Sequence, residues 1–410
     1  MVKFEGFTQV EGGVCAPQGF KASGVHCGIR KNQTKKDLAL IVAEVSCAAA
    51  AVYTQNKVKG SPILVTKQHL KNGMARAVIV NSGNANTCNA DGEEKAKLMC
   101  KYAADALAIE TEDVIVASTG VIGQVLDAAP IREGIPGLVK GLSDAGNTDA
   151  ADAILTTDLR RKESAVAFSL GGRRCHIGGM AKGSGMIHPN MATMLCFLTT
   201  DVAIDPAMLQ KALSQVTKLT FNRVTVDGDT STNDMASIMA SGLAENARIT
   251  REDEAYERFV NALYIVMMNL SREIARDGEG ATKLLECLCI HAASEDTAEK
   301  VSKAVIGSSL VKAAMFGCDA NWGRVLCAIG YADAPVDVTK VSVEFASVKG
   351  KILVCSDGAG VEFSEEAAKA ILSEDEVKIL VDLHDGEDKA VAWGCDLTYD
   401  YVKINGDYRT

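Results

Sequence analysis

A glycine-rich segment, residues 182–195, separates two strand-like stretches near the middle of the 410-residue chain and limits the folds open to it. It reads Lys-Gly-Ser-Gly-Met-Ile-His-Pro-Asn-Met-Ala-Thr-Met-Leu. A flexible approach leads to the small residue Ala192, then to Thr193, then to an apolar strand. This order suits a protein that cuts its own backbone between Ala192 and Thr193. The cut would require one interlocked fold that keeps residues 1–192 and 193–410 together as two chains.

An N-terminal threonine would combine a nucleophile and a base in one residue. The Thr193 hydroxyl would attack, and its own α-amine would accept the proton. A free α-amine has a pKa near ~8, so much of it is unprotonated at neutral pH. The spacing alone is also typical of an ordinary glycine-rich connection before a strand.

Two nucleotide-binding motifs are excluded in this segment. A phosphate-binding loop needs Lys-Ser or Lys-Thr directly after its last glycine, but Gly183 is followed by Ser184 and Gly185. The dinucleotide-binding fingerprint needs a third glycine, and residues 186–188 are Met-Ile-His. We therefore expect the glycines to serve a different purpose.

Read as a whole, residues 182–193 resemble the self-processing site of the bacterial ornithine acetyltransferases, the bifunctional glutamate N-acetyltransferases (ArgJ family) of arginine biosynthesis. Blocks that resemble the same family follow in order along nearly the whole chain. They are residues 17–20, 22–25, 37–41, 54–58, 81–86, 118–123, 156–158, 221–223, 227–234, 277–283, 321–324 and 404–410.

The resemblance implies a self-cleaving acetyltransferase. It would move acetyl from N-acetyl-L-ornithine to L-glutamate through an acetyl-threonine intermediate, giving L-ornithine and N-acetyl-L-glutamate. Acetyl-CoA stays open as a second donor. We expect no metal or redox cofactor, because acetyl transfer between two amines through an ester is close to thermoneutral. Alpha (1–192) and beta (193–410) chains would associate, as a heterotetramer of two of each.

The resemblance also assigns roles to residues outside the cut site. Thr193 is the nucleophile, and Thr119 and Gly120 form the oxyanion hole. The substrate-binding residues would be Thr156, Lys182, Thr193, Glu279, Asn405 and Thr410. The neighbouring Thr157 is the alternative to Thr156, and a role for Thr410 requires the C-terminal tail to fold back into the site.

The residue types fit these roles independently. Thr119 and Gly120 follow a strand-like run, where a glycine lets backbone approach a ligand closely. Lys182 suits a substrate carboxylate. Glu279, between two glycines, could receive the cationic end of ornithine. We interpret His188 as structural, because an α-amine would already supply the base.

Composition narrows the class of protein. The net charge of −10 argues against non-specific nucleic-acid binding, which needs basic surface. Thirteen cysteines without a CxxC pair predict free thiols used as small core residues, Cys47, Cys196 and Cys327 among them, in a reducing compartment. No metal pattern of Cys and His is visible among only six histidines. No signal segment or membrane span is apparent, so we expect a cytoplasmic protein.

Local patterns predict strands at 77–80, 114–117, 342–345 and 390–404, the last of them broken by Gly394, and helices at 93–107 and 253–276. Helices and strands without strict alternation indicate an α/β (α+β) fold. The resemblance specifies layered sheets and helices of the ornithine acetyltransferase, DmpA-like self-processing N-terminal-nucleophile type. Two rival functions remain: a self-processed aminopeptidase or amidase that passes the acyl group to water, and an uncleaved, non-enzymatic binding protein.

Overall fold

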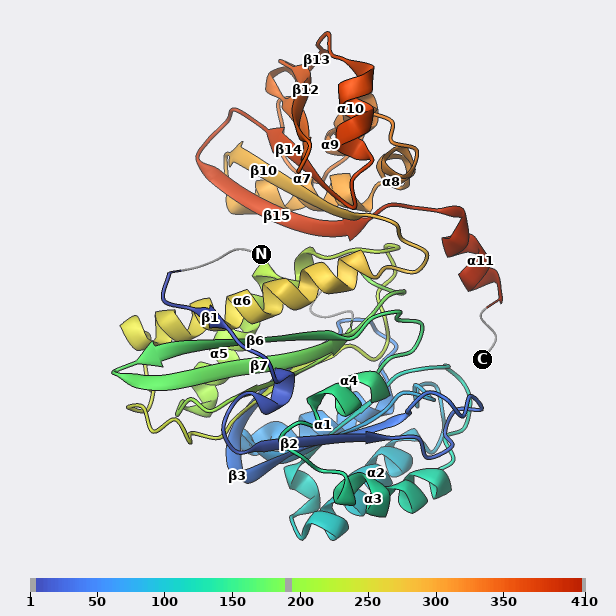
Figure 1. Cartoon of the computed structure of the whole chain (residues 1–410), viewed down its shortest axis with the longest axis vertical. Helices are drawn as coiled ribbons and strands as arrows, with labels where there is room; N and C mark the ends of the chain where they lie inside the picture. Colours follow the sequence, from blue (N-terminus) through green and yellow to red (C-terminus); the bar gives the residue numbers. More distant parts are fainter. Residues whose placement is uncertain (1–4, 189–193, 408–410) are drawn as a thin grey trace. The chain divides into compact units, whose positions relative to one another are not determined.

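The computed structural model describes residues 5–188 and 194–407, which form two compact units. The first unit comprises the chain up to Gly183 together with 189–222 and 230–270, and the second comprises 184–188, 223–229 and 271–410. Each unit is built around its own mixed sheet covered by helices (Figure 1). The predicted α/β (α+β) class is therefore confirmed.

The first unit contains a nine-stranded sheet in the order β1-β6-β7-β8-β9-β3-β4-β5, with β2 pairing with β3. The strands are β1 Thr8–Gln9, β2 Phe20–Val25, β3 Leu38–Tyr53, β4 Met74–Asn81, β5 Val114–Ser118, β6 Lys162–Leu170, β7 Arg173–Lys182, β8 Leu195–Thr200 and β9 Met235–Ala240. Strands β8 and β9 are parallel to each other and lie between β7 and β3. The sheet thus interleaves strands from both sides of the predicted cut.

Helices cover this sheet because their apolar faces are buried against it. They are α1 Ser61–His69, α2 Gly92–Leu107, α3 Ala129–Lys140, α4 Asn147–Ala153, α5 Pro206–Leu219 and the long α6 Glu254–Arg276. α4 packs on β2 and β3, α5 packs on β3, and α1 and α2 pack on β5. Leu270 of α6 lies against Gly179 of β7. The predicted strands at 77–80 and 114–117 and both predicted helices are confirmed.

The second unit has a six-stranded sheet in the order β13-β12-β11-β14-β10-β15. Its strands are β10 Leu284–Ala292, β11 Ser342–Ser347, β12 Gly350–Ser356, β13 Ala359–Gly360, β14 Glu376–Asp382 and β15 Asp388–Cys395. Its helices are α7 Glu295–Gly307, α8 Ser309–Phe316, α9 Trp322–Gly330, α10 Glu365–Leu372 and α11 Tyr399–Asp407. β10 runs parallel to β14 and antiparallel to β15.

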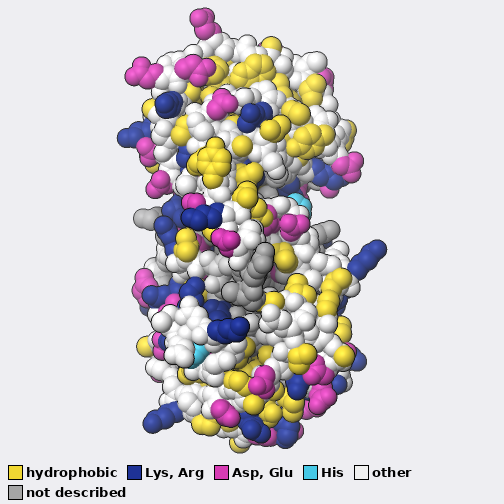
Figure 2. All heavy atoms as spheres, turned by 90° about the vertical axis from the view of Figure 1, so that its right-hand side faces the viewer, with side chains coloured by type: hydrophobic (Ala, Val, Ile, Leu, Met, Phe, Trp, Pro, Cys, Tyr) yellow, Lys and Arg dark blue, Asp and Glu magenta, His cyan; other side chains and the backbone are white. Residues whose placement is uncertain are grey.

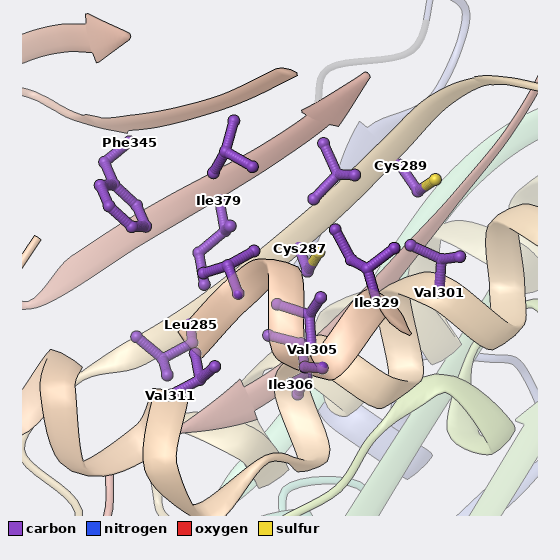
Figure 3. Packing of buried hydrophobic residues seen from close by; sticks show 14 of the residues in the cluster. Leu285, Cys287, Cys289, Val301, Val305, Ile306, Val311, Ile329, Phe345 and Ile379 are labelled. Atoms are coloured by element: carbon purple, nitrogen blue, oxygen red, sulfur yellow. The ribbon is translucent and has the colours of Figure 1, made fainter. Parts of the chain in front are cut away.

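The core of the second unit follows the two-residue period of its strands. Leu285, Cys287 and Cys289 of β10 are fully buried on one face. Figure 3 shows them packed with Ile379 of β14 and with apolar residues of α7 such as Val305. This face is buried and contains small sulfur-bearing residues, as expected for thiols used as core residues.

Two sequence expectations need correction. The predicted strand at 390–404 ends at Cys395, and α11 follows it. Gly394 lies inside β15 and does not break the strand. Its lack of a side chain makes room for Ile306 of α7, with which a Cβ at this position would collide. Cys327 is exposed, since α9 buries Val325, Ala328 and Ile329 on its other face. All thirteen cysteines are free thiols, and most are buried.

Candidate acyl-transfer site

The predicted cleavage segment connects two neighbouring antiparallel strands. β7 ends at Lys182 and β8 begins at Leu195, and these two residues are paired in the ladder. Met194 accepts a hydrogen bond at its carbonyl from the Met235 N–H at 3.0 Å, which joins it to β9. Ala192 and Thr193 lie outside the described residues, so the nucleophile and the cut remain predictions.

Thr119 and Gly120 directly follow β5. The Thr119 N–H donates to the Asn81 carbonyl at 2.9 Å, so this backbone donor is already used. Gly120 has φ 127°, and a Cβ there would lie 2.8 Å from the Asn84 nitrogen, so only glycine fits. Within residues 5–188 and 194–407, neither the Thr119 hydroxyl nor the Gly120 N–H has a hydrogen-bond partner. These are the two donors that an oxyanion could use.

Asparagine side chains fix the loops around these donors. The Asn81 side chain accepts from the Gly83 and Asn84 N–H groups at 3.0 Å and donates to the Ser118 hydroxyl at 2.7 Å. Asn233 donates to the Ala85 carbonyl at 2.6 Å and to the Ser118 carbonyl at 2.9 Å. Sequence reasoning gave neither asparagine a role, although both lie in blocks that carry the resemblance.

Asp158 is the centre of a buried charge cluster. Lys162 donates to it at 2.7 Å, and both side chains are fully buried. The Lys182 Nζ lies 3.9 Å from the second carboxylate oxygen. Burial alone would raise the pKa of Asp158, but the charges of Lys182 and Lys162 outweigh it and hold that pKa well below its usual range. The carboxylate is therefore ionised at neutral pH.

The same carboxylate organises two predicted substrate-binding residues. It accepts from the Thr156 N–H at 3.0 Å, from the Thr156 hydroxyl at 3.4 Å, and from the Gly183 N–H at 2.7 Å. Thr156 and Lys182 are therefore brought together, as the resemblance implies. Asp158 itself was missed, because the sequence does not show that it is buried between two lysines.

Asp234, which directly precedes β9, has an unusual environment. It is almost fully buried, and its Oδ2 atom has no hydrogen-bond partner in the described part of the chain. Burial raises the pKa of this carboxyl well above its usual value, although a hydrogen bond with Ser231 and the charge of Lys182 oppose the shift. The shift favours the protonated carboxyl group, which can donate a hydrogen bond as well as accept one.

In the second unit, Glu279 and Asn405 meet directly. The Asn405 amide donates to the Glu279 carboxylate at 2.8 Å, and the Glu279 N–H donates to the Ser184 carbonyl at 2.8 Å. A Cβ on Gly185 would collide with the Glu279 carboxyl group, so the chain passes very close to it. These two predicted binding residues are thus adjacent. Thr410 lies outside the described residues.

Asp227 anchors the first half of the cleavage segment. Its carboxylate accepts from the Met186 N–H at 2.6 Å, the Ile187 N–H at 2.9 Å and the Tyr401 hydroxyl at 3.2 Å. His188 hydrogen-bonds the Thr225 hydroxyl at 3.0 Å, and burial together with the charge of Lys303 lowers the pKa of His188. A neutral, half-buried imidazole agrees with its interpretation as structural.

The surface and the helices add two observations. On the face drawn in Figure 2, basic and acidic side chains are intermixed over the surface. None of the helices in the described ranges combines the length and apolar character needed to cross a bilayer.

Comparisons with known proteins identify relatives over almost the full length. The model of the ArgJ family matches residues 21–410. The arginine biosynthesis bifunctional protein ArgJ of Symbiobacterium thermophilum is 51% identical over 401 residues, covering 97% of this chain and 99% of that protein. The protein of the same name from Bacillus subtilis is 47% identical over 404 residues, covering 98% of each.

Solved structures of two proteins also have similar sequences. A crystal structure of the arginine biosynthesis bifunctional protein ArgJ from Bacillus halodurans is 50% identical, covers 52% of this chain and 98% of that chain, and has a TM-score of 0.49. The ornithine acetyltransferase of Mycobacterium tuberculosis, complexed with ornithine, is 37% identical, covers 45% of this chain and 100% of that chain, and has a TM-score of 0.42.

Proposed function

Since this chain belongs to the ArgJ family, we propose that it transfers acetyl from N-acetyl-L-ornithine to L-glutamate through an acetyl ester on Thr193. One observation carries the proposal. Residues 233–235 contact both segments that flank the proposed reacting residues, because the Asn233 side chain donates to the Ser118 carbonyl and the Met235 N–H donates to the Met194 carbonyl. Ser118 precedes the proposed oxyanion donors, and Met194 follows the proposed nucleophile.

The first reaction would be self-cleavage. The Thr193 hydroxyl attacks the Ala192 carbonyl carbon, the peptide C–N bond breaks, and the nitrogen takes up the hydroxyl proton. Water then hydrolyses the resulting ester, which leaves a carboxylate on residue 192 and a free amine on Thr193. That amine is the base for the second reaction.

In the second reaction the Thr193 hydroxyl attacks the acetyl carbonyl of N-acetylornithine. The Thr119 hydroxyl and the Gly120 N–H donate hydrogen bonds to the developing oxyanion. Ornithine leaves as its amine takes a proton, and the acetyl ester remains on Thr193. The glutamate amine then attacks this ester to form N-acetylglutamate and regenerate the hydroxyl.

Both substrates are amino acids, and the charged side chains fit their charges. Lys182 would bind the α-carboxylate that the two substrates share, with Thr156 beside it. Glu279, held by Asn405, would receive the cationic end of ornithine. Thr410 stays a proposed binding residue at the C-terminus.

The similar proteins are named bifunctional, which leaves room for a second activity. We propose acetyl-CoA as a second acetyl donor, that is, as a co-substrate, with no metal or redox cofactor. We expect the alpha and beta chains to stay associated as a heterotetramer of two of each. The thirteen free thiols support a reducing, cytoplasmic location.

Two assays test the proposal. Purified protein should give fragments 1–192 and 193–410, the second beginning Thr-Met-Leu-Cys by N-terminal sequencing, while Thr193→Ala should stay uncut and inactive. N-acetylornithine alone should add one acetyl group to fragment 193–410. Rapid acetate release without glutamate would identify the hydrolase instead. A fully active, uncut chain would rule out the N-terminal nucleophile.

A further inference from the structure

Three potential metal-ligating side chains gather at one end of the second sheet, within the second unit. β10 and β14 are parallel, with Ile290 paired to Asp382, so both strands end at the same edge. His291 follows Ile290, and His384 follows Asp382 by two residues. The sequence predicts no such group, because His291 and Asp382 are 91 residues apart.

The local backbone aims both rings at the same carboxylate. The pairing of β10 with β15 shifts register between Cys289 and Ala292, which is a bulge that includes His291. His291 and His384 have φ 50° and 48°, a left-handed conformation that few non-glycine residues adopt. Their rings stack with centroids 6.3 Å apart and 26° between planes.

The donor atoms form a compact set. His291 Nδ1 lies 2.9 Å from both Asp382 oxygens, and His384 Nδ1 lies 3.4 Å from one of them. All three ligand atoms lie within 4.8 Å of one another. Ligands about 2.0–2.1 Å from a tetrahedral zinc ion are roughly 3.3 Å apart. Small side-chain adjustments would therefore admit an ion between them.

The outer nitrogen of one ring is also fixed. His384 Nε2 hydrogen-bonds the Ser342 hydroxyl of β11 at 3.2 Å, which leaves Nδ1 directed toward Asp382. Ligating histidines usually bond a polar group through their second nitrogen in this way. The His384 N–H additionally donates to Asp382 at 3.0 Å. An ordinary surface ion pair would need neither the second imidazole nor this outer contact.

We propose that His291, Asp382 and His384 form a binding site for one divalent transition-metal ion, with Zn²⁺ as the best fit. Two imidazoles and a carboxylate are ligands that suit zinc, and three protein ligands leave one position open to water. Both histidine side chains are 48% exposed, so the ion can enter from solvent. The Asp382 side chain is only 17% exposed, and the hydrogen bond from the His384 N–H holds its carboxylate in place.

This site is separate from the proposed acetyl-transfer residues of the same unit. Glu279 precedes the first residue of β10, whereas His291 lies at the far end of that strand. Nine residues at about 3.3 Å per residue place the two ends of β10 more than ~25 Å apart. The metal site does not depend on the proposed function, and loss of the metal should leave acetyl transfer unchanged.

Calorimetric titration of the full-length protein with Zn²⁺ tests the proposal. The protein is first stripped with a chelator and alkylated with iodoacetamide, so that the exposed thiols of Cys88 and Cys327 cannot compete. We expect one equivalent to bind, and His291→Ala and His384→Ala each to weaken binding by at least about tenfold. The control is His26→Ala, because His26 faces a single carboxylate, Asp37, at 3.1 Å.

Ser342→Ala provides a second, milder variant that keeps all three ligands. Loss of an outer-shell partner typically weakens metal binding by about 10–100-fold, so we expect weaker Zn²⁺ binding with an unchanged melting temperature. Unaltered affinity in this variant would contradict coordination through His384 Nδ1. Wild-type-like binding by both histidine variants, or no stoichiometric binding by the wild type, would overturn the proposal.

Discussion

The ammonium group of Lys182 lies 3.9 Å from the carboxylate of Asp158, which a second lysine, Lys162, contacts at 2.7 Å. One buried carboxylate therefore faces two cations. Lys162 has a fully buried side chain, whereas that of Lys182 retains 10% exposure. Lys162 therefore pairs with Asp158 directly, whereas Lys182 lies at a longer distance and is proposed to bind a ligand as well.

This division of roles predicts different effects for the two lysines. Lys182→Met should raise KM for both N-acetylornithine and glutamate and lower the free energy of unfolding less than Lys162→Met does, because Lys162 still pairs with Asp158 at 2.7 Å. Lys162→Met should destabilise the fold by about 3 kcal/mol, the usual cost of breaking a buried ion pair. Urea unfolding and steady-state kinetics on both variants check this. Equal stability losses would contradict the assignment.

Thr119 and Gly120 should respond differently to substitution by alanine. Thr119→Ala removes one oxyanion donor and should slow acetyl transfer by about 10²–10³-fold without changing the melting temperature. Gly120→Ala should also destabilise the protein, because its φ of 127° and the nearby Asn84 backbone exclude a Cβ. Paired measurements of kcat and thermal unfolding separate the two. An unchanged kcat in Thr119→Ala would remove that residue from the mechanism.

Asp234 should make stability fall as pH rises. Its folded-state pKa lies above the unfolded value of ~3.9, so between these two values the folded state holds more protons than the unfolded state. Ionisation of the unfolded chain therefore favours unfolding as pH increases through this window. Asp234→Asn removes the titration, so its stability relative to wild type should increase from pH 4 upward. Urea unfolding across pH 4–8 measures the difference, and a pH-independent difference would refute the shift.

Cys318 should be the most readily alkylated of the half-buried cysteines at neutral pH. Burial alone would raise its pKa, but hydrogen bonds from Lys283, whose Nζ lies 3.0 Å from the sulfur, and from Ser373 lower it. Burial raises the pKa of Cys15 to about 11 and that of Cys27 to about 12, so these thiols provide matched controls. A lower pKa gives more thiolate at pH 7, and the thiolate is the nucleophile.

Site-resolved mass spectrometry after brief iodoacetamide treatment at several pH values checks this order. Lys283→Met should shift the alkylation profile of Cys318 to higher pH and leave Cys27 unchanged. If Cys318 reacts no faster than Cys27 at pH 7, the lysine does not activate it.

Local sequence patterns were sufficient where an element is marked by a short continuous apolar run or by an apolar face of regular period. The buried run 77–80 became part of β4, and the apolar face of 253–276 became α6. The run 390–404 is predicted as a strand broken by Gly394, but β15 continues through Gly394 to Cys395 and α11 follows it. The glycine instead accommodates Ile306, a contact between residues 88 positions apart in the sequence that no local pattern reveals.

The same distinction applies to the residues of the candidate site. The resemblance brought forward Thr156, Lys182, Glu279 and Asn405, and the structure places the first two around Asp158 and the last two in direct contact. The sequence does not predict three further residues, because their roles depend on burial and on partners distant along the chain. They are Asp158, Asn233 and Asp234. Their residue types alone are equally common in solvated turns.

The interleaved strand order of the first sheet favours folding of the two halves as one continuous polypeptide. β8 and β9 enter between β7 and β3, so a piece containing only residues 1–192 or only 193–410 would expose unpaired strand edges, which invite aggregation. The covalent link between β7 and β8 acts as a tether that keeps the two sets of strands at high effective concentration while the ladders close. Co-expression of the two halves as separate polypeptides should therefore yield far less folded protein than the continuous precursor.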